Sequence, residues 1–95
     1  MTINKKMEGG VLTVALDGRL DTMTAPELEK ELDGLAGAKE LVFDLTGLEY
    51  VSSAGLRVFL RAHKLMNGNM TVRGANEMIN EIFEVTGFTD VFDIE

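Results

Sequence analysis

Apolar and polar residues alternate along residues 10–20, where Val14 and Leu16 are among the apolar members. A period of two is typical of a half-buried β-strand. The preceding residues 2–8 are more polar, and the Gly-Gly pair that joins the two segments favours a hairpin. A second run, KELVFDL at residues 39–45, is almost continuously apolar. It predicts a strand that is buried on both faces or lies under a layer of helices.

Helical periodicity follows the first predicted strand. In TAPELEKELDGLAG, residues 24–37, leucines recur at positions 28, 32 and 35, which is the spacing of an amphipathic helix. Thr24 and Glu27 have the spacing of a capping box, and the proline between them suits a first helical turn. We therefore predict a helix that begins with a side-chain cap and ends at Gly34 or Gly37.

Two further helices are predicted in the second half of the chain. The segment GLRVFLRAHKLM (55–66) has apolar residues among arginines and lysines and precedes an Asn-Gly pair that ends helices. The segment EMINEIFEVTG (77–87) has an apolar stripe, an asparagine in capping position before it and a glycine at its end. Short strands are predicted at residues 69–75 and, at the edge of the sheet, at residues 88–95.

The order of these elements indicates the fold class. Strands that alternate with helices imply parallel connections, so we expect an α/β (α+β) fold in which helices cover the sheet. The chain has 95 residues, of which 45% are hydrophobic, and this suffices for one core. We therefore expect a single domain over residues 1–95.

Composition and charge narrow the function classes. The chain has no cysteine, which rules out disulfides and thiolate metal sites and suits a reducing cytoplasm. The first residues lack the apolar stretch of a signal peptide or a membrane span, so we expect a cytoplasmic protein without a membrane partner. The net charge of −7 disfavours binding to nucleic acid. Small size and an acidic surface favour a monomer.

Few residues offer catalytic chemistry. His63 is the only histidine, and the sequence has no cysteine to complete a zinc site or a nucleophile-base pair with it. Glycine-rich phosphate loops and a nucleophile elbow are also missing from the sequence. We therefore expect no enzyme, no cofactor and no metal. Asp21 follows one predicted strand and Asp44 ends another, so we expect both at one rim of the sheet, as turn caps or as a metal-binding or acid-base pair.

Two adjacent serines, Ser52 and Ser53, precede the helix predicted at residues 55–66. A serine there caps the helix by accepting a hydrogen bond from a free backbone N–H group, but one cap needs only one serine. Because Gly55 leaves the first turn bare, we expect the second hydroxyl to be accessible to another protein's active site. A phosphate at this point adds about −1.5 to −2 charges at the favourable end of the helix dipole. The pair is either an ordinary cap or a cap beside a phosphorylation site.

Three segments together resemble the STAS domain, specifically the single-domain anti-sigma-factor antagonists of bacteria. They are GRLDTMTAPEL, LVFDLTGLEYVSSAGLRVFL and FEVTGFTDVFDI, and the likeness extends over nearly the whole chain. The resemblance implies a STAS-like mixed β-sheet of four to five strands with helices packed mainly on one face. In that family the serine two residues before the glycine is the phosphoacceptor, which corresponds to Ser53. Several members have an aspartate immediately before the phosphoacceptor, whereas this chain has Ser52, so a second hydroxyl is available and Ser52 is the alternative acceptor.

The resemblance also implies partners and a mechanism. Unphosphorylated antagonists of this family bind an anti-sigma factor serine kinase, phosphorylation ends the binding, and a serine phosphatase restores it. Under this hypothesis the residues that contact the partner surround Ser53 and are Asp21, Val51, Ser52, Ala54, Gly55 and Leu56. One alternative is a scaffold or sensory STAS module that binds a nucleotide or another anionic ligand at the same helix start. A second is a phosphoryl-carrying enzyme that uses the two aspartates and a divalent metal.

Overall fold

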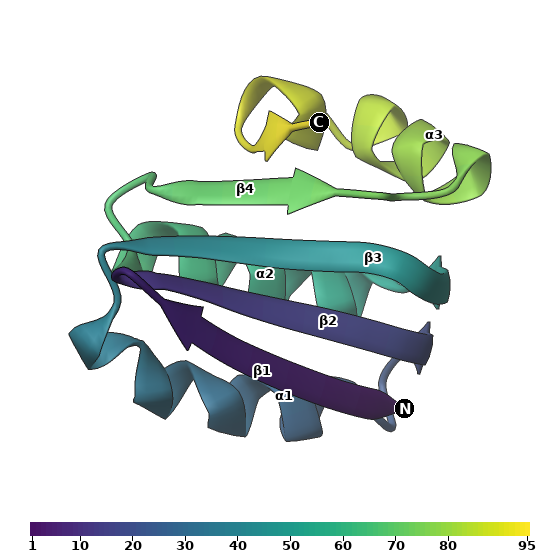
Figure 1. The fold of residues 1–95 in the computed structure, drawn as a ribbon. Coiled ribbons are helices and arrows are strands. Elements are labelled where there is room, and N and C mark those ends of the chain that lie inside the picture. Colours follow the sequence, from purple (N-terminus) through teal and green to yellow (C-terminus); the bar gives the residue numbers. More distant parts are fainter.

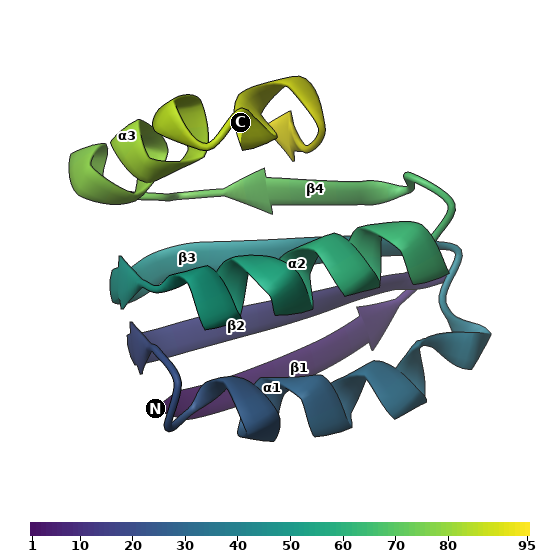
Figure 2. The same ribbon diagram turned by 180° about the vertical axis from the view of Figure 1, so that it is seen from behind.

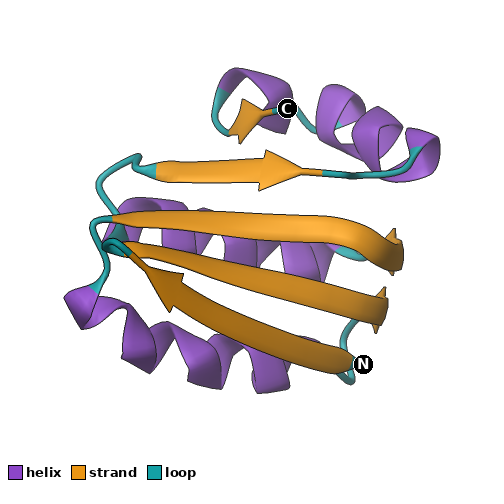
Figure 3. Cartoon of the chain, viewed as in Figure 1, coloured by secondary structure: helices purple, strands orange, loops and turns teal.

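Five strands form one mixed sheet in the computed structural model, which describes the backbone of residues 1–95 and every side chain except that of Ala36. The strand order is β1-β2-β3-β4-β5. Only β1 and β2 are antiparallel, and the remaining neighbours are parallel. The predicted mixed sheet is thereby confirmed (Figure 3). The strands are β1 (Thr2–Glu8), β2 (Val11–Leu20), β3 (Glu40–Val51), β4 (Met70–Arg73) and β5 (Asp93–Ile94).

Two of the three α-helices cover one face of this sheet. Helix α1 (Ala25–Glu31) continues into a short 3-10 helix, η1 (Leu32–Gly37), and α1 and α2 (Ser53–Leu65) lie on the same side of the sheet (Figures 1 and 2). Helix α3 (Glu77–Val85) lies beyond β4 and is followed by η2 (Phe88–Asp90). Within the described part of the chain, none of the helices is both long and apolar enough to cross a lipid bilayer.

The alternation predicted from the sequence places the core on the helix-covered face. In residues 11–16 of β2 and 41–45 of β3, every second side chain is buried, and the side chains between them are only partly covered. Phe59 of α2 lies at the centre of this core, with its ring 4.8 Å from Phe43 and 6.4 Å from Phe83 of α3. The second long strand is therefore buried under helices on one face rather than on both.

Strand β3 is longer than the sequence indicated. The apolar run predicted a strand over residues 39–45, yet residues 46–51 continue it to Val51. The register between β2 and β3 shifts at two points, and such bulges let a strand accommodate extra residues. Gly47 allows β2 to approach closely at one of them, because a Cβ atom there would overlap the Asp17 carboxylate. Gly47 thus permits close pairing of the two strands.

The predicted capping box at the start of α1 is wrong. Thr24 is the N-cap residue, but its side chain makes no capping hydrogen bond to the helix. Its hydroxyl instead accepts a hydrogen bond from the Asp21 N–H at 2.9 Å and donates one to the Arg19 carbonyl at 2.8 Å. Since the hydroxyl is held by the residues that precede the helix, it stabilises the turn between β2 and α1 rather than the first helical turn.

Candidate functional site

The candidate site lies where β2 and β3 end together at one edge of the sheet. Leu20 and Val51 are paired neighbours in these two strands, and the Ser52 N–H donates a hydrogen bond to the Leu20 carbonyl at 2.9 Å. The chain then leaves β2 at Asp21 and leaves β3 at Ser52. The start of α2 and the turn that leads to α1 consequently emerge from adjacent strands at the same edge (Figure 2).

The two serines have different structural roles. Ser52 is the N-cap of α2, with extended backbone angles (φ −96°, ψ 174°), and its hydroxyl oxygen accepts a hydrogen bond of 3.5 Å from the Gly55 N–H. Ser53 is the first helical residue and is exposed. Among the described side-chain hydrogen bonds, none involves the Ser53 hydroxyl. The cap therefore requires Ser52 and leaves Ser53 accessible.

Gly55 serves close packing rather than a bare first turn, which corrects the expectation from the sequence. The residue is buried, and a Cβ atom on it would lie 2.6 Å from Leu20 Cγ and 2.8 Å from Val51 Cγ2. No side chain fits at those distances, so the glycine lets α2 begin directly against the ends of β2 and β3. The exposure of Ser53 follows from its own position on the outer side of this turn.

Three residues of the expected partner surface lie in the core. Val51 and Leu56 are buried hydrophobic residues, and Gly55 is enclosed between them and β2. The side chains of Val51 and Leu56 are enclosed in the core, and Gly55 contributes close packing rather than a side chain. The partly or fully exposed members of the expected surface are Asp21, Ser52, Ser53 and Ala54.

Asp21 is held in a fixed orientation beside the start of α2. Its Oδ1 accepts hydrogen bonds from the Met23 N–H at 3.0 Å, the Thr24 N–H at 3.2 Å and the Thr24 hydroxyl at 3.3 Å. Partial desolvation acts to raise the pKa of Asp21. The hydrogen bonds from Thr24 and Met23 and the charge of Arg19 outweigh it and hold the pKa below its usual value. Asp21 therefore contributes a fixed negative charge next to the serines.

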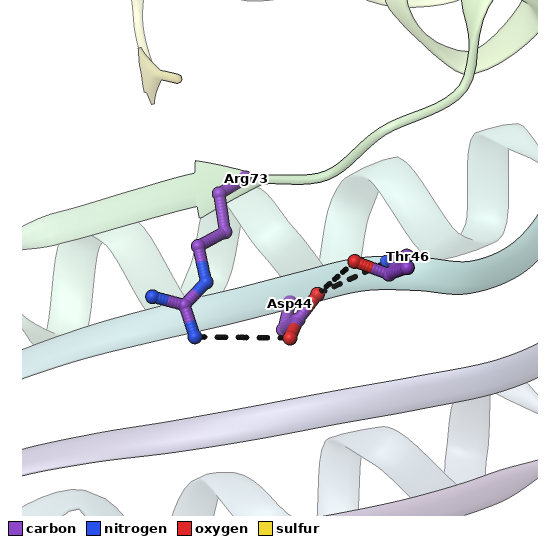
Figure 4. Close-up of polar contacts among 3 residues, drawn as sticks. All are labelled: Asp44, Thr46 and Arg73. Carbon is purple, nitrogen blue, oxygen red and sulfur yellow. Dashed lines mark hydrogen bonds and ion pairs between the residues drawn. The ribbon is translucent and has the colours of Figure 1, made fainter.

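Asp44 belongs to a different cluster, on the sheet face that α1 and α2 leave open (Figure 4). Its Oδ1 accepts hydrogen bonds from the Thr46 hydroxyl at 2.6 Å and from the Thr46 N–H at 3.1 Å, and its Oδ2 lies 3.7 Å from Arg73 Nη2. The two Thr46 hydrogen bonds lower the pKa of Asp44, and the Arg73 charge adds to them, against a smaller opposing effect of desolvation.

The expectation that Asp21 and Asp44 share one rim of the sheet is wrong. Asp44 lies in the middle of β3, seven residues before Val51, whereas Asp21 directly follows the partner of Val51 in β2. At about 3.3 Å per residue the two carboxylates are separated by roughly 20 Å. Among the described residues, no group of three or more histidine, cysteine, aspartate or glutamate side chains is arranged to hold a metal ion. The pair therefore has no geometry for a shared metal or for acid-base catalysis.

A shallow groove between α1 and α2 extends the site beyond the residues that the sequence suggested. Thr22 and Ala54 line it near the start of α2, and Arg57 follows one helical turn after Ser53. At its far end Arg61 Nη1 contacts Glu29 Oε1 at 2.7 Å. The i to i+4 spacing of Ser53 and Arg57 is visible in the sequence and places both on one side of α2. Arg57 is exposed and is thus a site residue that the sequence reasoning missed.

Comparison with known proteins establishes the family. The model of the STAS domain matches residues 2–95. The chain belongs to the STAS domain family. The anti-sigma-B factor antagonist of Staphylococcus aureus is 31% identical over 86 residues, which are 85% of this chain and 80% of that protein. Sequence similarity therefore relates this STAS domain to anti-sigma factor antagonists, as the motifs had indicated.

Solved structures agree with this STAS fold. An anti-sigma factor antagonist from Mycobacterium paratuberculosis superposes with a TM-score of 0.88 at 24% identity, over 98% of this chain and 83% of that chain. The Bacillus cell fate determinant SpoIIAA, solved in its phosphorylated form, has a TM-score of 0.76 at 12% identity, over 99% of this chain and 91% of that one. At these identities the superpositions show a shared fold.

Proposed function

We propose that this STAS domain is an anti-sigma factor antagonist whose binding state is set by phosphorylation of Ser53. Unmodified, it binds an anti-sigma factor serine kinase through the exposed residues around the start of α2; phosphorylation by that kinase ends the binding, and a serine phosphatase restores it. The observation that carries the proposal is the division of roles between the two serines. Ser52 caps the helix, and Ser53 presents an exposed hydroxyl at the first helical position.

The chemistry of the switch is a phosphoryl transfer and its hydrolytic reversal. The Ser53 hydroxyl oxygen attacks the γ-phosphorus of ATP bound to the kinase, the bond between that phosphorus and the β,γ-bridging oxygen breaks, and ADP leaves. The serine proton passes to a base of the kinase. The phosphatase adds water across the serine phosphate ester and releases inorganic phosphate, which returns Ser53 to its hydroxyl form. This chain supplies the acceptor oxygen and no catalytic group.

The fold tolerates the phosphate. The first helical turn of α2 contains no acidic residue, and a negative group there interacts favourably with the helix dipole. Arg57, four residues later, adds a positive charge on the same side of the helix. The Gly55 amide is already bonded to Ser52, so the modification leaves the cap intact. We expect phosphorylation to change the interface without unfolding the domain.

Binding ends because the new charge lies at the centre of the proposed contact surface. A docked partner covers Ser53, so a phosphate of about −1.5 to −2 charges has to lose its water when the complex forms. Asp21, which keeps its carboxylate ionised, increases the negative charge of this surface further. Desolvation and charge repulsion therefore act together against the complex.

The test compares three immobilised proteins in a pull-down from lysate of the source organism, with mass spectrometry of the captured proteins. They are the wild type, Ser53→Glu, and Asn69→Glu as the control. Asn69 is exposed and precedes β4 at the opposite edge of the sheet, so its variant adds the same charge away from α2. We expect the wild type and the control to retain an ATP-binding serine kinase and Ser53→Glu to lose it. Equal retention of that kinase by Ser53→Glu would contradict the proposal.

A further inference from the structure

Helix α3 presents an apolar stripe that the core covers only in part. Ile79 and Phe83 face the core and are buried. Met78 and Val85, on the other side of the helix, are 53% and 81% exposed, and Ile82 between them is half-buried. These three side chains, with Glu81 and Thr86, line a shallow groove of about 310 Å³. An exposed apolar surface of this kind, bordered by polar residues, is typical of an interaction site.

The negative charge of the chain is concentrated in the C-terminal segment that contains α3. Residues 74–95 contain six of the sixteen acidic residues of the chain and none of its nine lysines and arginines, so they carry −6 of the net charge of −7. Three of these acidic residues, Glu77, Glu81 and Glu84, belong to α3 itself, and all three are exposed. The remaining 73 residues are close to neutral in sum. The apolar stripe thus lies on a helix whose exposed charged side chains are all negative.

This combination identifies the chemistry of the occupant. A second copy of the chain would bring an equally negative surface against the stripe, and nucleic acids and anionic membranes are repelled in the same way. An apolar stripe with an acidic border is complementary to an amphipathic helix whose polar face is basic. We propose that the groove of α3 binds a basic amphipathic helix of a protein partner.

The geometry of α3 suits a helix-in-groove contact. Met78, Ile82 and Val85 follow the i, i+4, i+7 spacing and extend over two helical turns, which matches the apolar face of a partner helix. The helix is also fixed at its start. Asn76 accepts from the Ile79 N–H at 2.8 Å and donates to the Leu48 carbonyl at 3.3 Å in β3. The stripe is therefore held in place before a partner binds, so that binding loses little free energy in ordering this helix.

The stripe is separate from the α2 start in sequence and in the fold. Helix α3 lies beyond β4, whereas Ser53 begins a helix on the covered face of the sheet (Figures 1 and 2). The proposal therefore does not depend on phosphorylation. Ser53→Glu and wild type are expected to bind a basic amphipathic helix equally well, so failure of one proposal is distinguishable from failure of the other.

The test uses a fluorescein-labelled synthetic peptide of leucine and lysine, about 14 residues long, with its leucines on one helical face. Fluorescence anisotropy measures its binding to the full chain. The variant Met78→Ser/Val85→Ser removes two exposed anchors, and Met23→Ser, at a methionine that is 84% exposed before α1, is the matched control. We expect binding about tenfold weaker for the double variant and unchanged for the control. Glu81→Gln is expected to weaken binding about two- to fivefold and to reduce its salt dependence.

Three outcomes would overturn the proposal. They are equal binding of the peptide by wild type and Met78→Ser/Val85→Ser, equal binding of a peptide in which glutamates replace the lysines, and absence of binding at low ionic strength. Amide chemical-shift changes in a titration of the labelled protein provide the second readout. We expect them to concentrate in residues 77–86, and changes concentrated elsewhere would also contradict the assignment. Circular dichroism verifies that each variant is folded, which is expected because the substituted side chains are exposed.

Discussion

Helices α2 and α3 begin with the same type of cap but differ in the first helical residue. In each, the N-cap side chain accepts a hydrogen bond from the N–H of the third helical residue: Ser52 from Gly55 at 3.5 Å, and Asn76 from Ile79 at 2.8 Å. The first helical residue of α3 is Glu77, which places a carboxylate in its first turn. In α2 the equivalent position is Ser53, and its first turn contains no acidic residue.

The difference separates a structural helix start from a switchable one. A carboxylate at the first position compensates the positive end of the helix dipole permanently, as in α3. In α2 that compensation is missing, and a phosphate on Ser53 would supply it. The two starts also differ in side-chain attachment, because the Asn76 side chain additionally donates hydrogen bonds to β3, whereas the Ser52 side chain makes only the longer capping bond. We therefore expect α3 to depend more on its cap and α2 more on its close packing.

The largest effect is expected from filling the space beneath the α2 start. Gly55→Ala places a Cβ atom 2.6 Å from Leu20 Cγ, and we expect it to lower the free energy of unfolding by about 1–3 kcal/mol. Urea unfolding measures the change. Gly34→Ala is the control, since no atom lies within 4 Å of its added Cβ and it is expected to be neutral or slightly stabilising. Equal stability of wild type and Gly55→Ala would show that the tight packing is not required.

A smaller and unequal effect is expected from removing the two caps. Asn76→Ala loses the 2.8 Å capping bond and the bonds to β3, and we expect a loss of about 1–2 kcal/mol. Ser52→Ala loses one long bond, and we expect about 0.5–1 kcal/mol. The same urea titration ranks the two variants. A larger loss for Ser52→Ala would reverse the proposed difference between the helix starts.

Asp44 and Asp21 are expected to contribute to different properties, Asp44 to the stability of the domain and Asp21 to the binding of the kinase. The pKa of Asp44 is lowered in the folded state, so its stabilising effect is fully present above its unfolded pKa near 3.9 and is lost as pH falls through the folded value. We expect Asp44→Asn to cost about 1 kcal/mol at pH 7 and to flatten the loss of stability as the pH falls below the unfolded pKa of the aspartate. Kinase binding should be unchanged by Asp44→Asn and altered by Asp21→Asn. The opposite binding pattern would place the interface on the open face of the sheet.

The smallest effect is expected from changing the charge of the first helical residue, by adding a carboxylate to α2 or by removing the one in α3. Ser53→Glu gives α2 the carboxylate that α3 has, and we expect a gain of about 0.3–1 kcal/mol; Glu77→Gln is expected to lose a similar amount. Both changes should diminish at high salt. Thermal unfolding at low and high ionic strength measures them. A Ser53→Glu protein less stable than the wild type would contradict the view that α2 accommodates a negative group.

Much of the fold is predictable from periodicity, because each core element buries one face. The alternation in β2 and the leucine spacing in α1 depend only on which side chains face the sheet-helix interface. The length of β3 was not predictable, since Gly47 acts through its contact with Asp17, a neighbour in another strand. The capping box failed for a similar reason: the Thr24 hydroxyl has a competing partner in the preceding turn.

The site was predictable in part. The sequence indicates that a serine pair begins α2, but it does not decide which serine is the cap, because serine is tolerated at both positions. Which serine is the cap is decided by the end of β3 at Val51, because the Ser52 N–H that follows it donates a hydrogen bond to the Leu20 carbonyl. The prediction that Asp21 and Asp44 share one rim of the sheet failed because β3 is longer than the sequence indicated. Arg57 was missed because its relevance depends on the exposure of Ser53 one turn earlier.

The most direct test of the central claim is to locate the phosphate. Wild type, Ser52→Ala and Ser53→Ala are incubated with the kinase retained by the wild type and with ATP, and tandem mass spectrometry assigns the modified residue. We predict one phosphate on Ser53 in the wild type and in Ser52→Ala, and none in Ser53→Ala. A phosphate on Ser52 in the wild type, or undiminished phosphorylation of Ser53→Ala, would contradict the assignment of Ser52 as cap and Ser53 as switch.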